Sequence, residues 1–141
     1  MNIGKVVKTG IAVGITIIAL DFVINSFVLG SYIAGLPFVN TGFATAMTWN
    51  LVGDLVAGLV FALVFDRVRG SFGPGMAGGL TFGLYAGVIV NFPTWHFAHL
   101  YIKDWPYMAS WVWTCSGIFM GLVEGAVAGI MYDMGEKKAA A

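Results

Sequence analysis

The length of its apolar segments constrains this chain more than any other feature, because a helix that crosses a bilayer needs roughly 20 consecutive apolar residues. Four segments reach that length, near residues 9–30, 44–65, 76–97 and 108–132. Charged residues make up only 10% of the 141 residues, whereas a soluble domain carries about 25%. The sequence therefore predicts an all-α polytopic membrane protein, with a single transmembrane domain over residues 1–141 that folds as a four-helix transmembrane bundle.

The basic residues predict the orientation of this bundle. One side of the four segments holds six of them, namely Lys5, Lys8, Arg67, Arg69, Lys137 and Lys138. The other side holds Lys103. Because cytoplasmic loops are enriched in Lys and Arg, we expect a multi-pass topology with both the N and the C terminus in the cytoplasm.

Composition restricts the classes of function. Seven basic and seven acidic residues cancel, so we expect no basic patch for nucleic acid. Cys115 is the single cysteine, which excludes an intrachain disulfide and a CxxC motif. The sequence contains no phosphate-binding loop and no zinc-protease spacing. We expect a protein that is not an enzyme and that binds lipid rather than a cofactor.

Two pairs of similar segments indicate an internal repeat. Gly10–Thr16 (GIAVGIT) resembles Gly75–Thr81 (GMAGGLT), and Leu55–Asp66 (LVAGLVFALVFD) resembles Leu122–Asp133 (LVEGAVAGIMYD). The shifts are 65 residues (10 to 75) and 67 residues (55 to 122), so the two matches are nearly in register. This pattern predicts two parallel helical-hairpin repeats, in residues 1–70 and 71–141. The alternative is a chance match between glycine- and valine-rich spans.

Glycines recur on the predicted spans at intervals that place them on one helix face. They are Gly14, Gly58, Gly79, Gly83, Gly87, Gly117, Gly121 and Gly125. Small residues let helix backbones approach closely in lipid. We therefore predict that these positions lie at helix–helix contacts.

Six acidic and amide side chains interrupt the predicted spans. They are Asp21, Asn25, Asn50, Asp54, Asn91 and Glu124. At a rise of 1.5 Å per residue, Asp21 and Asp54 both lie roughly 16–18 Å from the cytoplasmic ends of their helices. A carboxylate that faces lipid costs on the order of 3 kcal/mol, so we expect these side chains to face neighbouring helices.

Two interpretations of this intramembrane polar cluster are open. In the first, the cluster joins helices through hydrogen bonds worth about 0.6 kcal/mol each, and Asp54 pairs with Asn25, Asn50 or a protonated Asp21. In the second, it lines a cavity in which Asp21 and Asp54 carry protons or a cation, since no predicted span contains Lys or Arg.

Two histidines, His96 and His99, lie three residues apart at the outer end of the third span. On a helix they share a face, where they could bind a metal together with Asp104, or where one could ligate a haem or chlorin. Two histidines without a third ligand at fixed spacing are a weak signal. The alternative is that they form hydrogen bonds with lipid headgroups or with loop backbone.

Two stretches carry a resemblance to known proteins. Asp21–Gly35 (DFVINSFVLGSYIAG) and Gly121–Asp133 (GLVEGAVAGIMYD) resemble segments of small, uncharacterised four-span bacterial inner-membrane proteins, a domain of unknown function. The resemblance implies a four-span fold and the bacterial inner (cytoplasmic) membrane, and it implies no activity.

Two classes of function remain. We expect a non-catalytic accessory or structural subunit of a larger bacterial membrane complex of the respiratory or photosynthetic type, with other membrane subunits or itself as partner. The alternative is a homo-oligomeric transporter or channel for a small solute, an ion or protons, which uses the intramembrane carboxylates. The direction of the carboxylates distinguishes them: outward to a partner for a subunit, or inward to a hydrated cavity for transport.

Overall fold

The computed structural model describes residues 2–36 and 43–139, and in these ranges every regular element is a helix. In chain order they are α1 (Ile3–Val23), the π-helix η1 (Ile24–Val28), α2 (Gly30–Ala34), α3 (Phe43–Val68), the 3-10 helix η2 (Arg69–Ser71), α4 (Gly75–Tyr101) and α5 (Tyr107–Ala139). The all-α prediction is confirmed for these residues. The ends of the predicted domain, residues 1 and 140–141, and the connection 37–42 lie outside the described residues.

Three helical stretches are long and apolar enough to cross a membrane: Ile3–Val28, Gly75–Tyr101 and Tyr107–Met134. They confirm the prediction of a helical membrane protein. The second predicted segment, 44–65, lies inside the 26-residue α3, which is not one of these three stretches. The count of four spans therefore stays a prediction, as do the identity of the membrane and the side on which the termini lie.

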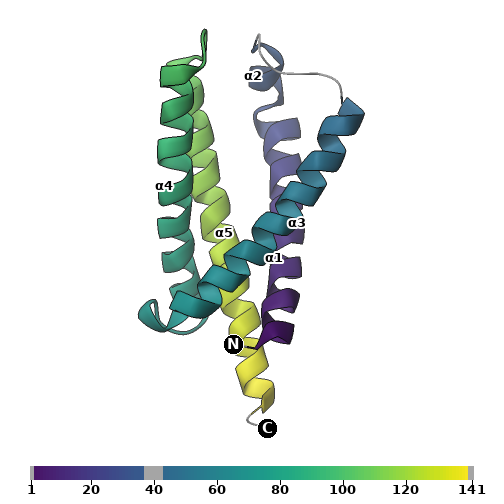
Figure 1. Cartoon of the computed structure of the whole chain (residues 1–141), viewed down its shortest axis with the longest axis vertical. Helices are drawn as coiled ribbons and strands as arrows, with labels where there is room; N and C mark the ends of the chain where they lie inside the picture. The colour runs from purple at the N-terminus through teal and green to yellow at the C-terminus, as the bar shows by residue number, and fades with distance from the viewer. Residues whose placement is uncertain (1, 37–42, 140–141) are drawn as a thin grey trace.

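The long helices form two hairpins (Figure 1). α1 packs against α3, α4 packs against α5 along most of its length, and α1 also contacts α5. α3 runs obliquely across α1, so that its start lies away from the α4–α5 hairpin while its end lies close to the start of α4. Each hairpin falls within one predicted repeat half, although the repeat itself stays a prediction.

Glycines allow the helices of each hairpin to approach closely. A Cβ atom added at Gly58 on α3 would fall on the backbone of Gly14 on α1. In the other hairpin, a Cβ atom at Gly79 on α4 would fall on the carbonyl group of Gly125 on α5. Contacts this close bring two backbones into van der Waals contact, which is a main source of helix association in lipid.

An aromatic cluster joins the two hairpins where α3 ends. Phe82 on α4 contacts Phe61 and Phe65 on α3, with ring centroids 5.0 and 5.2 Å apart, and Phe72 after η2 at 5.5 Å. Phe65 and Tyr132 on α5 are almost fully buried. These rings are the main link between α3 and the α4–α5 hairpin, because the first part of α3 lies away from that hairpin.

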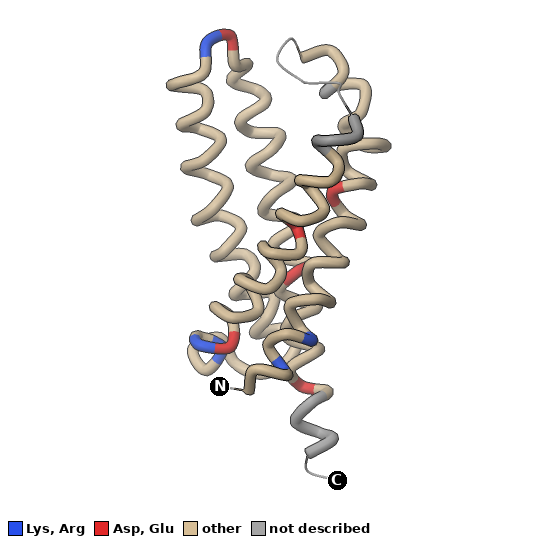
Figure 2. The backbone as a smooth tube through the Cα atoms, turned by 45° about the vertical axis from the view of Figure 1, so that its right-hand side comes forward, with Lys and Arg blue, Asp and Glu red and all other residues tan. Residues whose placement is uncertain are grey.

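The two ends of the bundle differ in composition (Figure 2). Lys and Arg gather at the end of the bundle where α1 begins and α3 ends. We call this the basic end, and it holds Lys5, Lys8, Arg67 and Arg69. At the opposite end, Trp95, Trp105 and Trp113 lie with ring centroids 5.6–5.9 Å apart. Aromatic residues of this kind are enriched at membrane–water interfaces.

Candidate functional site

Three carboxylates of the predicted polar cluster come from three different helices. Asp21 lies on α1, Asp54 on α3 and Glu124 on α5, and each residue is only partly exposed. The charge of Asp54 interacts with that of Asp21, and the charge of Glu124 interacts with that of Asp54. The structure therefore brings these carboxylates near one another around α1, the helix that contacts both α3 and α5.

Asp21 has a hydrogen-bond partner within its own segment. The Asn25 side-chain Nδ2 donates to the Asp21 Oδ1 atom over 2.6 Å. Asn25 lies in the π-helix η1, which widens the helix by one residue per turn directly after Asp21. Single π-helical turns inside α-helices occur frequently at functional sites. The two residues thus form one polar unit on the first span.

Asn50 and Asp54 lie one helical turn apart on α3. Asn50 is exposed and Asp54 is partly exposed. Within the described ranges, neither side chain forms a hydrogen bond, so the pairing of Asp54 with Asn25, Asn50 or Asp21 that the sequence led us to expect is not formed there. Asp54 lies one helical turn before Gly58, on the side of α3 that packs against α1, where a Cβ atom added at Gly14 would lie 3.3 Å from the Asp54 carbonyl oxygen.

Asn91 belongs to a different part of the molecule. Its Nδ2 donates to the Gly87 carbonyl oxygen over 2.9 Å, and its Oδ1 accepts from the Trp95 Nε1 over 3.2 Å. The side chain fills the space beside Gly117 on α5, where an added Cβ atom would collide with it. Asn91 therefore contributes to α4–α5 packing and lies apart from the carboxylates.

The predicted packing glycines of this hairpin lie along the same contact. Gly83 and Gly121 face each other, because a Cβ atom at either one would meet the carbonyl oxygen of the other. Gly87 lies against the backbone of Ile118. The glycine faces of α4 and α5 thus cover each other, leaving no small-residue groove there for another helix.

The two histidines form hydrogen bonds with backbone carbonyl groups. His96 Nδ1 lies 2.9 Å from the Phe92 oxygen, and His99 Nδ1 lies 3.1 Å from the Trp105 oxygen. Since a carbonyl oxygen only accepts, each Nδ1 donates in these hydrogen bonds. The His96 Nε2 atom is buried without a hydrogen bond in the described structure, and its ring stacks on Phe92 at 4.3 Å.

The described residues contain no group of three or more His, Cys, Asp or Glu side chains that could hold a metal ion. The bond from His99 to Trp105 is of the loop-backbone kind that was the alternative interpretation of these histidines. Ligation of a metal, haem or chlorin by His96 or His99 stays untested, and no step of the proposals below depends on it.

Sequence reasoning missed a cavity at the basic end. It has a volume of about 450 Å³, and its lining includes Asp66, Arg69, Tyr132 and Asp133. The sequence assigned Arg69 to topology and gave Tyr132 no role. Asp66 and Asp133 end the two similar segments of the predicted repeat, and that equivalence was the one available signal for a site here.

In comparisons with known proteins, no family model, no curated protein and no solved structure matches this chain. The resemblance to four-span bacterial inner-membrane proteins therefore stays a prediction, and function has to be argued from the site alone.

Proposed function

We propose that this protein is a small, non-catalytic subunit of a larger membrane assembly in the bacterial inner membrane. The proposal includes four spans, with α3 as the second, and both termini in the cytoplasm. The basic end supports that orientation, because it holds Lys5, Lys8, Arg67 and Arg69, whereas the opposite end holds Lys103.

The observation that carries the proposal is the uncovered face of α3. Large apolar side chains are exposed along it, among them Val52, Val56 and Val60, at 48–53% of their surface. Lipid alone would suit these side chains. It would not suit Asn50, which lies on the same helix and is exposed, because polar side chains inside a membrane are costly unless they are paired. A neighbouring polypeptide that covers α3 and supplies polar groups removes that cost.

The glycine contacts support the proposal of a duplicated scaffold. Under the shifts of 65 and 67 residues, Gly14 corresponds to Gly79 and Gly58 corresponds to Gly125. Gly14 contacts Gly58 in one hairpin, and Gly79 contacts Gly125 in the other. Equivalent glycines thus make equivalent contacts, which favours two parallel hairpin repeats over a chance match. The carboxylates are absent from the matching positions, as expected if they were added for a partner.

The experiment that tests the subunit proposal is extraction of the protein from its native membrane in a mild detergent, followed by a native gel and mass spectrometry of the band. We expect co-migration with a large hetero-complex whose other chains identify the assembly. A band that contains this chain alone, at a small multiple of 15.0 kDa, would contradict the proposal.

A second candidate is a homo-oligomeric transporter or channel for protons, an ion or a small solute. The observation that favours it is the interaction of Asp54 with both Asp21 and Glu124, with no Lys or Arg between residues 9 and 66 or between residues 104 and 136 to neutralise them. Carboxylates in such a setting carry exchangeable protons or cations in many transporters. Flux into proteoliposomes that is lost in Asp54→Asn would favour this candidate over the subunit.

A further inference from the structure

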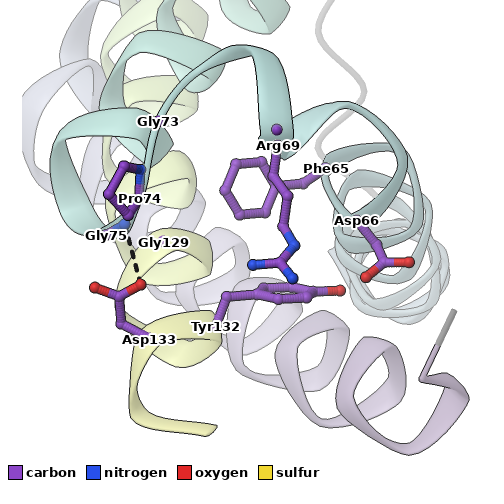
Figure 3. Close-up of a pocket in the computed structure, with 10 residues that line it drawn as sticks. Phe65, Asp66, Arg69, Gly73, Pro74, Gly75, Gly129, Tyr132 and Asp133 are labelled. Atoms are coloured by element: carbon purple, nitrogen blue, oxygen red, sulfur yellow. Dashed lines mark hydrogen bonds between the residues drawn. The ribbon is translucent and has the colours of Figure 1, made fainter. Parts of the chain in front are cut away.

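The cavity at the basic end is partly open to its surroundings. It lies where the end of α3, η2, the start of α4 and the end of α5 meet (Figure 3). Its volume of about 450 Å³ is in the range of small-molecule pockets. Glycines keep it open: Gly73, with φ 83°, takes a left-handed conformation that favours glycine, and an added Cβ atom at Gly70 or Gly73 would meet nothing within 4 Å.

A cation is held in place on one wall. The guanidinium carbon of Arg69 lies 5.0 Å from the centroid of the Tyr132 ring, and Figure 3 shows the guanidinium over that ring. Lys5 Nζ also approaches the ring, at 4.7 Å from its centroid. Tyr132 is 2% exposed, so the ring is a fixed platform. The guanidinium is thereby oriented, and the N–H groups of a guanidinium suit the oxygens of a phosphate group.

Two carboxylates line the same cavity, on opposite sides of the Arg69–Tyr132 pair (Figure 3). Asp133 Oδ1 accepts from the Gly75 backbone N–H over 3.1 Å, at the start of α4. That bond and the helix dipole stabilise the Asp133 charge. Asp66 lies on the other side, next to the Tyr132 hydroxyl group, with which its carboxylate interacts.

The charges of the cavity select the class of ligand. A simple anion would be repelled by the carboxylates of Asp66 and Asp133, and a simple cation would be repelled by the guanidinium of Arg69. A zwitterion that carries a phosphate and a primary ammonium group is attracted at both of its charges, the phosphate by Arg69 and the ammonium group by a carboxylate. The location selects its source, since the cavity adjoins the ends of two membrane-capable stretches, Gly75–Tyr101 and Tyr107–Met134, where lipid headgroups lie.

We propose that this cavity binds the headgroup of phosphatidylethanolamine, with the phosphate on the Arg69 guanidinium and the ammonium group on the Asp66 carboxylate. The inference is independent of the subunit proposal, because Asp54 does not line this cavity. Lipid binding here would hold for a subunit and for a transporter alike. It also gives the bound lipid a defined position in the fold.

The test uses the full-length protein in detergent and native mass spectrometry, which counts lipid bound to folded protein. Phosphatidylethanolamine, phosphatidylglycerol and phosphatidylcholine with the same acyl chains are added in turn. We expect phosphatidylethanolamine to be retained most strongly. Loss of one charge-assisted hydrogen bond corresponds to roughly a tenfold loss of affinity, so we expect about that loss in Arg69→Gln and in Asp66→Asn, and specifically for this lipid.

Lys103→Gln is the matched control, because it removes the same charge at the opposite end of the bundle, and we expect it to bind like the natural chain. Gly70→Leu is a second variant that narrows the cavity without changing charge, and we expect it to weaken binding too. Equal retention of all three lipids, a preference for phosphatidylglycerol, or an equal loss in Lys103→Gln would overturn the proposal. If free phosphoethanolamine displaces the lipid when both are present at the same concentration, the natural ligand would be a soluble phosphoethanolamine compound rather than a lipid.

Discussion

The rings of Phe65 and Tyr132 pack edge to face, with centroids 5.4 Å apart and planes at 78°, although 67 positions separate them in the chain. Phe65 lies near the end of α3 and Tyr132 near the end of α5. They occupy matching positions in the two similar segments of the predicted repeat. The contact joins the two hairpins at the basic end and forms part of the wall of the cavity there.

Replacement of Phe65 by alanine is expected to separate the hairpins. Phe65 is 2% exposed and contacts both Phe82 and Tyr132. Removal of a buried ring of this kind costs about 3 kcal/mol in the free energy of unfolding. The measurement is reversible unfolding in mixed micelles. Phe119→Ala on α5 is the control, since Phe119 is 53% exposed, and an equal loss in both variants would contradict a special role for the Phe65–Tyr132 contact.

A larger side chain at Gly58 is expected to force α3 away from α1. An added Cβ atom there already falls on the Gly14 backbone, whereas at Gly53, on the same helix, it meets nothing within 4 Å. We expect Gly58→Val to lower the free energy of unfolding by about 2 kcal/mol and Gly53→Val to change it by less than about 0.5 kcal/mol. If the two variants unfold alike, α1 and α3 do not pack through this glycine.

Asp133 is expected to stabilise the first turn of α4. Its side chain accepts from the Gly75 N–H over 3.1 Å, so Asp133→Ala leaves that donor without a side-chain acceptor and should cost about 1 kcal/mol. Faster amide hydrogen exchange at Gly75 and the following residues is the direct measurement. Asp104→Asn serves as the control, because Asp104 is exposed with φ 63°, a conformation that Asn also adopts. Unchanged exchange in Asp133→Ala would show that the bond is not formed.

Asp54→Asn separates the two candidate functions. The substitution removes a charge that repels Asp21, so we expect the isolated chain to be at least as stable as before. If the protein is a subunit, the amount of assembled complex falls in the native membrane while any solute flux is unchanged. Western blotting of native gels measures the first quantity and a proteoliposome assay the second. Normal assembly together with abolished flux would reject the subunit proposal.

The sequence by itself determined the helices and the membrane class, because both depend on local properties. The hydrogen bonds of a helix close within four residues, and the length of an apolar run decides whether it can span a bilayer. The predicted segments 76–97 and 108–132 accordingly fall inside α4 and α5. Glycine spacing also predicts a helix face, since a face is fixed by the helical repeat.

Only the tertiary structure decided which side chains meet. Asn91 belongs to the same predicted polar cluster as Asn25, yet it bonds to Trp95 within the second hairpin, because α4 faces α5 rather than α1. Asp66, Arg69, Tyr132 and Asp133 come together because α3 crosses α1 obliquely and ends beside α4. Crossing angles depend on the packing of two surfaces at once, and a periodic pattern along one helix does not contain that information.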